Sequence, residues 1–216
     1  MSDSIIAGVG GQGTVLASKL LAKAALLEGH MVRTAETIGM AQRGGSVLGH
    51  VRITRENTYG GAHDGSFSNK PFSPIIPAAS ADLLIGFEPG ETVRALPFLR
   101  EGGSVVTTKQ VMVPAAAAYT SQLYDGVAEL DYLRTCRTNG RIGSLIALDG
   151  QALCTRIGSS RVLNVLLLGA TLATKSIEIT ERSLIAALEA LIKPEFIEVN
   201  KRALEAGITA SELIWA

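Results

Sequence analysis

Short apolar runs alternate along the chain with longer segments in which apolar residues recur every three or four positions. The first apolar run, at residues 4–7, precedes a cluster of glycines, and residues 14–27 then carry apolar side chains at helical spacing. Gly29 is suited to end that helix, because glycine commonly follows the last helical turn. The sequence MVRTAE at residues 31–36 predicts a second strand. A strand, a glycine loop, a helix and a second strand in this order are typical of the opening of a parallel α/β sheet.

The rest of the chain continues this alternation. Further strands are predicted at residues 46–53, 81–88, 104–108 and 144–150. One helix begins at Pro89, and three more are predicted at residues 160–175, 181–192 and 194–208. Residues 55–77 are rich in Gly, Asn, Ser and Pro and are expected to be mostly loop, whereas residues 113–139 leave a helix and a turn undecided. We therefore predict a single α/β domain over residues 1–216, Rossmann-like, with a mainly parallel sheet flanked by helices and a helical C-terminal third.

Composition narrows the class of protein. Lys and Arg number 20, as do Asp and Glu, so the net charge is zero, and a neutral chain with 5% aromatic residues argues against a nucleic-acid partner. Two cysteines without a C-x-x-C pair, Cys136 and Cys154, cannot hold an iron–sulfur cluster by themselves and are typical of a reducing compartment. The N-terminus lacks the features of a signal peptide, and the most apolar run, residues 162–173, is shorter than the ~20 residues that cross a bilayer. We expect a cytoplasmic protein with no membrane partner.

The glycine cluster GVGGQG at residues 8–13 contains the spacing G-x-G-x-x-G at Gly8, Gly10 and Gly13. A glycine loop between a strand and a helix directs backbone N–H groups at the helix's positive end, where a phosphate can bind. In a dinucleotide site an acid near the end of the second strand binds the ribose, and Glu36 has that place. The spacing to Glu36 is longer than the fingerprint requires, however, and the chain is short for a dehydrogenase. A nucleotide site and a glycine turn without a ligand both remain open.

A second polar cluster, GMAQRGGSVLGHVRI, spans residues 39–53. It places Gln42 and Arg43 just after the second predicted strand, and the planar donor fork of Arg43 suits a phosphate or carboxylate. A surface turn with a solvated arginine is the alternative. The three histidines are scattered without metal-ligand spacing, and no nucleophile lies beside a base. We therefore predict no catalytic residue and no metal site, and a chain that contacts a ligand or a partner.

Taken together, the two clusters resemble the gamma-type subunit or domain of 2-oxoacid:ferredoxin oxidoreductases. The version MAQRGGSV at residues 40–47 is most similar to the small (beta) subunit of the indolepyruvate branch of this family. The resemblance extends in order along nearly the whole chain and is poor only at about residues 112–139. It is carried further by SPIIP at 73–77, ADLLIGFEPGETVRALPFL at 81–99, GGSVVTT at 102–108, LNVLLLGA at 163–170 and KPEFIEVNKRALEAG at 193–207.

The resemblance implies a small, non-catalytic subunit in a hetero-oligomer with a large catalytic (alpha) subunit. The complex would decarboxylate a 2-oxoacid oxidatively, form an acyl-coenzyme A and reduce ferredoxin. Thiamine diphosphate, Mg²⁺ and [4Fe-4S] clusters would lie in the large subunit, none of them bound by this chain alone. Carried onto this sequence, the candidate contacts for coenzyme A are Gly10, Gly11, Gln12 and Gly13, with Gln42 and Arg43 in the facing loop.

Three alternatives remain open at this point. The chain could be the gamma subunit of an oxidoreductase for another 2-oxoacid, such as pyruvate or 2-oxoglutarate. It could be a stand-alone NAD(P)-dependent oxidoreductase that uses G-x-G-x-x-G and Glu36. It could also be a non-enzymatic protein that binds a nucleotide or an acyl-coenzyme A at the same loop.

Overall fold

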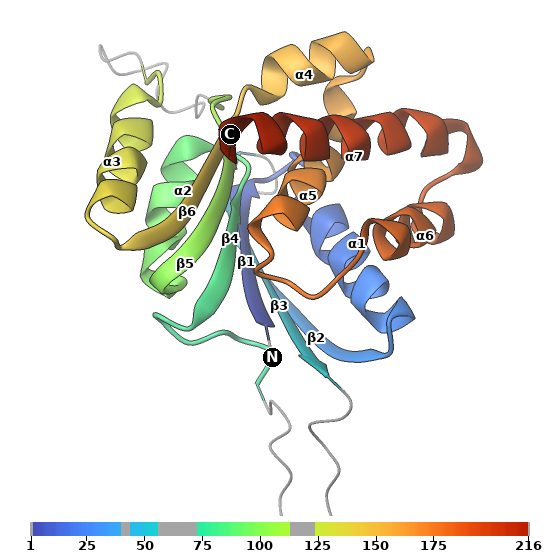
Figure 1. Cartoon of the computed structure of the whole chain (residues 1–216), viewed down its shortest axis with the longest axis horizontal. Helices are drawn as coiled ribbons and strands as arrows, with labels where there is room; N and C mark the ends of the chain where they lie inside the picture. The colour runs from blue at the N-terminus through green and yellow to red at the C-terminus, as the bar shows by residue number, and fades with distance from the viewer. Residues whose placement is uncertain (1, 40–43, 56–72, 113–123, 216) are drawn as a thin grey trace, which may run out of the picture.

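The structure is a computed structural model that describes residues 2–39, 44–55, 73–112 and 124–215. A central β-sheet has helices packed on both of its faces (Figure 1). The strands are β1 (Ser2–Val9), β2 (His30–Ile38), β3 (Ser46–Arg55), β4 (Ala81–Gly86), β5 (Leu99–Thr108) and β6 (Ile142–Leu148). The helices are α1 (Thr14–Leu27), α2 (Pro89–Ala95), α3 (Val127–Thr138), α4 (Gly150–Ile157), α5 (Leu163–Thr174), α6 (Glu181–Leu191) and α7 (Pro194–Trp215).

Within the described ranges the strands form one sheet in the order β2-β3-β1-β4-β5-β6. β1, β4, β5 and β6 are parallel to one another. β3 runs antiparallel to β1, and β2 runs antiparallel to β3. The prediction of an α/β fold with a mainly parallel sheet flanked by helices is confirmed.

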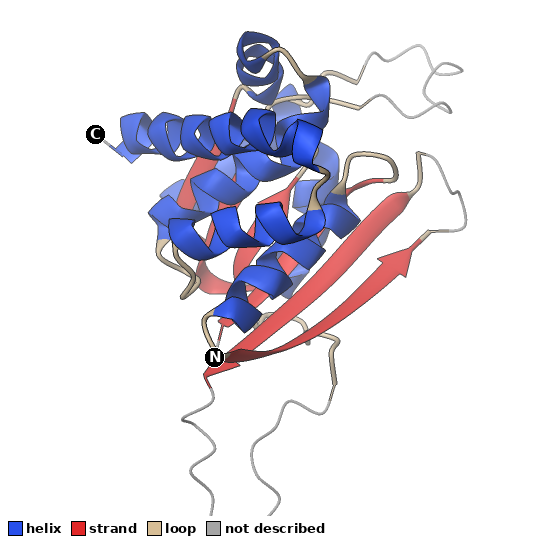
Figure 2. Ribbon diagram, turned by 90° about the vertical axis from the view of Figure 1, so that its right-hand side faces the viewer, coloured by secondary structure: helices blue, strands red, loops and turns tan. Residues whose placement is uncertain are grey.

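The position of β2 differs from the simplest strand–helix–strand unit, in which the second strand lies beside the first. β3 lies between β1 and β2, so that Ile6 is opposite Gly49 and Gly49 is opposite Glu36. β2 and β3 are consecutive along the chain, and strands joined by a short connection pair antiparallel. β3 buries Val51 and Ile53 and takes the inner position, whereas most of β2 is exposed and lies at the edge. Figure 2 shows this long antiparallel pair at the margin of the sheet.

The two faces of the sheet carry separate apolar cores. One core packs β1, β3 and β4 against α1, α5, α6 and α7, and the other packs the opposite face against α2 and α3. Successive residues of a strand point to opposite faces, so the adjacent Ile5 and Ile6, both fully buried, belong to different cores. Strands buried on both faces explain the continuous apolar runs in the sequence.

Most predicted helices are found, with changes at their ends. α1 has the predicted bounds, and Gly29 follows it in a left-handed conformation with φ 80°. α7 extends beyond the predicted residue 208 to Trp215, and α3 lies in the segment that the pattern left undecided. α4 was not predicted, because it is short, although Asp149 caps it by accepting the Ala152 N–H at 2.9 Å. No helix among the described residues is long and apolar enough to span a membrane.

Candidate functional site

The site predicted from the sequence lies at the carboxyl edge of the sheet, where β1 and β4 end side by side. β1 leads into α1 on one face of the sheet, and β4 leads into α2 on the other. The chain therefore leaves the two neighbouring strands in opposite directions. In open α/β sheets, such a point of divergence forms the crevice in which ligands bind.

The glycine loop is a tight turn from Val9 to Gly13. The Gln12 N–H donates to the Val9 carbonyl at 3.1 Å and closes the turn, while the Gly10 N–H donates to the Gly45 carbonyl at 2.8 Å. Gly11 and Gly13 have φ values of 101° and 86°, which side chains other than glycine rarely adopt. The backbone conformation at these two positions therefore requires glycine.

The loop opens onto a hollow of about 450 Å³ at the N-terminus of α1. Its lining consists of Gly10, Gly11, Gly13, Thr14, Val15, Leu16, Lys19, Ile38 and Val47. The first turn of α1 has no acidic residue and receives no side-chain cap from the described part of the chain, so its N–H groups lie at the hollow without an intrahelical partner. The exposed ammonium of Lys19 adds a positive charge. This arrangement suits a phosphate or another anion.

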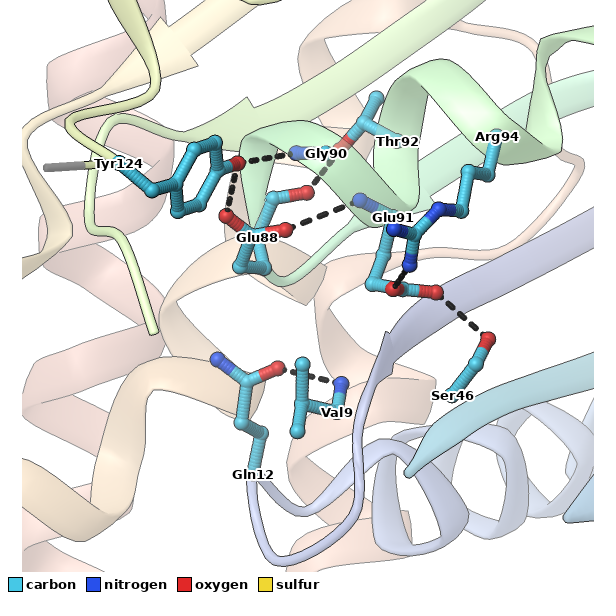
Figure 3. A network of polar contacts seen from close by, with 9 residues as sticks. All are labelled: Val9, Gln12, Ser46, Glu88, Gly90, Glu91, Thr92, Arg94 and Tyr124. Atoms are coloured by element: carbon cyan, nitrogen blue, oxygen red, sulfur yellow. Dashed lines mark hydrogen bonds and ion pairs between the residues drawn. The ribbon is translucent and has the colours of Figure 1, made fainter. Parts of the chain in front are cut away.

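Gln12 is placed differently from the three glycines around it. Its Oε1 accepts the Val9 N–H at 2.7 Å (Figure 3). Its Nε2 donates to the Phe87 carbonyl at 2.9 Å. Both polar groups of the side chain are therefore engaged with the ends of β1 and β4. Gln12 is also absent from the residues that line the hollow.

A polar cluster on the β4 side of the crevice was not predicted. Glu88 is almost completely buried, and its Oε2 accepts the Glu91 N–H at 2.9 Å at the start of α2. The Tyr124 hydroxyl donates to Glu88 Oε1 at 2.5 Å and accepts the Gly90 N–H at 2.9 Å (Figure 3). Burial raises the pKa of the Glu88 carboxyl above its ordinary value, although these hydrogen bonds oppose the change. The sequence signal for this cap was the Glu-Pro pair at residues 88 and 89.

Glu91 connects the same cluster to β3. Its carboxylate pairs with Arg94 and accepts the Ser46 hydroxyl at 2.5 Å. Ser46 follows Gly45, whose carbonyl is bound by the glycine loop. The segment before β3, the glycine loop and the start of α2 therefore meet around one point.

The other candidate residues fall in different places. Gln42 and Arg43 lie outside the described residues, but the chain on both sides of them is held at the site, because the Gly39 N–H donates to the Ser46 carbonyl at 2.9 Å. Glu36 lies on the edge strand with β3 between it and β1, and it lines a separate hollow of about 430 Å³. The acid of a dinucleotide site lies on the strand next to the first, so this geometry does not support an NAD site.

His50 and the two cysteines are packed residues. His50 is buried, and its Nδ1 accepts the Ile76 N–H at 3.2 Å. Burial, together with the charge of Arg52, lowers its pKa. Cys136 and Cys154 are buried in the cores on opposite faces of the sheet, so they cannot bind one metal together.

A mainly parallel sheet with a glycine loop at its point of divergence defines a class of α/β domains that bind phosphate-bearing ligands at the carboxyl edge. Comparison with known families is more specific. Residues 3–210 match the family model of pyruvate ferredoxin/flavodoxin oxidoreductase, and the chain belongs to this family.

Individual relatives agree with this assignment. The chain is 32% identical over 208 residues to the indolepyruvate oxidoreductase subunit IorB of Thermococcus kodakarensis, covering 96% of this chain and 95% of that protein. The keto/oxoacid ferredoxin oxidoreductase gamma subunit of Geobacter sulfurreducens has the same fold, with a TM-score of 0.66, 18% identity and 99% of both chains covered. The 2-oxoglutarate:ferredoxin oxidoreductase of Magnetococcus marinus matches 98% of this chain with 31% of its own, at a TM-score of 0.65 and 17% identity. The prediction of a small subunit of a 2-oxoacid:ferredoxin oxidoreductase is confirmed.

Proposed function

We propose that this chain is the small subunit of an oxidoreductase for indolepyruvate or a related arylpyruvate. The complex would convert the 2-oxoacid and coenzyme A to an acyl-coenzyme A and carbon dioxide, and would pass two electrons to ferredoxin. The substrate class is supported by the name of the Thermococcus relative, which is similar to this chain over nearly the full length of both. Because coenzyme A and ferredoxin are the co-reactants, we place the complex in the cytoplasm.

The cofactors of the reaction are assigned to a large catalytic partner subunit. Thiamine diphosphate with Mg²⁺ supplies the electron sink for decarboxylation, and [4Fe-4S] clusters carry the electrons away. The residues of this chain do not fit an iron–sulfur cluster, because its two cysteines, Cys136 and Cys154, lie on opposite faces of the sheet. No group of three or more His, Cys, Asp or Glu residues in the described ranges could hold a metal ion. The chain's own contribution would be binding and assembly.

We further propose that the glycine loop binds a phosphate of coenzyme A. The observation that carries this proposal is the hollow of about 450 Å³ over the uncapped N-terminus of α1. The N–H groups of Gly11 and Gly13 and the charge of Lys19 would bind the phosphate. Gly10, whose N–H donates to the Gly45 carbonyl, would line the site, and Gln42 and Arg43 would approach from the facing segment. The Magnetococcus enzyme, in which 31% of the chain matches this fold, has coenzyme A bound.

Anaerobic affinity purification of the tagged chain from its native cells tests the assignment of a partner. We expect a much larger chain to co-purify, with brown iron–sulfur absorbance and releasable thiamine diphosphate. The complex should reduce ferredoxin faster with indolepyruvate than with pyruvate or 2-oxoglutarate. A colourless chain that purifies alone would contradict the subunit assignment, and a preference for pyruvate or 2-oxoglutarate would contradict the substrate class.

A further inference from the structure

The ladder of hydrogen bonds between β1 and β4 is interrupted at its last rung. Ala7 is the partner of Gly86, and the Phe87 N–H donates to the Ala7 carbonyl at 2.8 Å. In a parallel ladder the next bond would run from the Val9 N–H to the Phe87 carbonyl. The side-chain amide of Gln12 stands in this place instead, accepting from Val9 at 2.7 Å and donating to Phe87 at 2.9 Å.

The inserted amide separates the two strands without leaving a polar group unpaired. It donates and accepts as a peptide group would, so the bonds that the strands lose to each other are replaced. The space beside it is full, because a Cβ on Gly8 would lie 2.8 Å from Phe87 Cβ and 2.9 Å from Gln12 Oε1. The same residue also closes the loop through its own N–H to the Val9 carbonyl. Gln12 therefore determines both the width of the crevice and the course of the loop.

We propose that Gln12 is a positioning residue that holds the crevice between β1 and β4 open and thereby fixes the glycine loop for coenzyme A. The part of this proposal that concerns coenzyme A rests on the proposed function. Gln12 then acts through the loop and does not contact the ligand.

Replacement of Gln12 by glutamate gives a specific test. Gln12→Glu keeps the shape and the acceptor for Val9, but an ionised carboxylate has no donor for the Phe87 carbonyl and repels it. A protonated carboxyl has that donor, so lowering the pH should restore the bond, and we expect partial burial to raise the pKa of the introduced group. We expect the Kd of the Gln12→Glu complex for coenzyme A to be roughly tenfold weaker than wild type at pH 8 and to approach wild type near pH 6.

The experiment must account for the other titratable groups near Gln12. Glu88, Glu91 and Tyr124 lie on the β4 side, and Lys19 lies on α1. These groups are the same in the wild-type complex, so the ratio of variant to wild-type Kd is compared at each pH. Gln151→Glu, the same change at an exposed position of α4, is the matched control and should leave the ratio near one.

Steady-state kinetics distinguish a positioning role of Gln12 from a general loss of folding or activity. In the Gln12→Glu complex at pH 8, the KM for coenzyme A should rise while the KM for the arylpyruvate stays unchanged. Wild-type affinity of the Gln12→Glu complex at both pH values would overturn the proposal. So would a loss of affinity that is equal at pH 6 and pH 8, because a protonated carboxyl would then fail to replace the amide.

A second measurement does not depend on coenzyme A. In the full-length chain without ligand, the side-chain amide hydrogens of Gln12 should exchange with solvent more slowly than those of exposed Gln151 by NMR. Equal exchange of the two amides would overturn the positioning role. If the wild-type complex fails to bind coenzyme A, the proposed ligand of the loop is wrong, and this exchange experiment still tests whether the Gln12 amide is held between Val9 and Phe87.

Discussion

The two turns that flank the crevice have the same position in the sheet but opposite polar character. The turn after β1 leads into α1, whose first turn has no side-chain cap and no acidic residue. The turn after β4 leads into α2, where Glu88 caps the helix and Tyr124 binds the Gly90 N–H. The positive end of α2 is thus occupied by the chain's own groups, whereas that of α1 faces the hollow.

The contrast explains why we propose the N-terminus of α1, and not that of α2, as the ligand site. An anion at α2 would have to displace the Glu88 carboxyl group and the Tyr124 hydroxyl, which already accept the N–H groups of Glu91 and Gly90. An anion at α1 meets N–H groups and Lys19. The two strand–helix turns at the same edge therefore differ in accessibility, because the turn before α2 is filled by the chain's own groups.

Removal of the internal cap at α2 should have the largest effect. Glu88→Ala leaves the Tyr124 hydroxyl and the Glu91 N–H without their partner, and we expect the free energy of unfolding to fall by about 3 kcal/mol. Urea unfolding of the full-length chain measures it. Glu88→Gln, which keeps the shape and an acceptor, should lose about half as much. A change within experimental error for Glu88→Ala would show that the cluster contributes nothing to stability.

A side chain added at the base of the glycine loop should lower the free energy of unfolding by somewhat less than Glu88→Ala does. In Gly8→Ala the added Cβ would lie 2.8 Å from both Phe87 Cβ and Thr14 Cγ2, so the loop must shift. We expect a loss of about 2 kcal/mol and a lower Tm, with weaker binding of coenzyme A to the complex. Calorimetry and ligand titration check the two effects. Unchanged affinity in a destabilised variant would argue against the loop as the ligand site.

The open helix end can be changed with little effect on packing. Gly11 and Gly140 both have positive φ and no atom near the site of an added Cβ, so alanine at either should cost about 1 kcal/mol. Only Gly11→Ala alters the loop, and we expect it to weaken coenzyme A binding by about tenfold while Gly140→Ala does not. Equal affinities in the two variants would contradict the proposed site.

The buried carboxyl should also make stability depend on pH. Because the pKa of Glu88 is raised in the folded state above its ordinary 4.5, folding favours the protonated form. Its stabilisation is fully present below pH 4.5 and is lost as the pH rises through the raised folded value. The Tm of the wild type minus that of Glu88→Gln should therefore fall between pH 4 and pH 7. A difference that grows with pH would mean that the ionised form is the one stabilised.

The smallest expected effect concerns Lys19. Lys19→Ala removes an exposed charge beside the hollow, so the stability should stay within about 0.5 kcal/mol of wild type. The affinity of the complex for coenzyme A should fall about threefold at low salt and less at high salt. Lys23→Ala, one turn further along α1 and outside this hollow, is the control. Equal effects of the two variants would exclude a specific contact.

The course of the glycine loop was predicted from the sequence, but the contacts of its polar side chain were not. Gly10, Gly11 and Gly13 line the hollow, as expected of residues whose spacing requires a tight turn before a helix. The contacts of Gln12 could not be predicted in the same way, because its partner Phe87 is 75 residues away and directly follows β4, whose neighbours in the sheet were unknown. Glu88 and Tyr124 are 36 residues apart, and Tyr124 lies in the segment with the weakest pattern.

The sequence by itself determined the alternation of strands and helices and the bounds of α1, because hydrophobic periodicity and glycine spacing are local properties. The family followed from the resemblance of its motifs to a known family. The tertiary structure alone decided that β3 lies between β1 and β2, which removes Glu36 from the site. It also decided that the amide of Gln12 replaces a rung between β1 and β4. Periodicity records which side of a strand is buried, but it does not record which strands are neighbours. The residues that depend on that order could therefore be placed only in the folded chain.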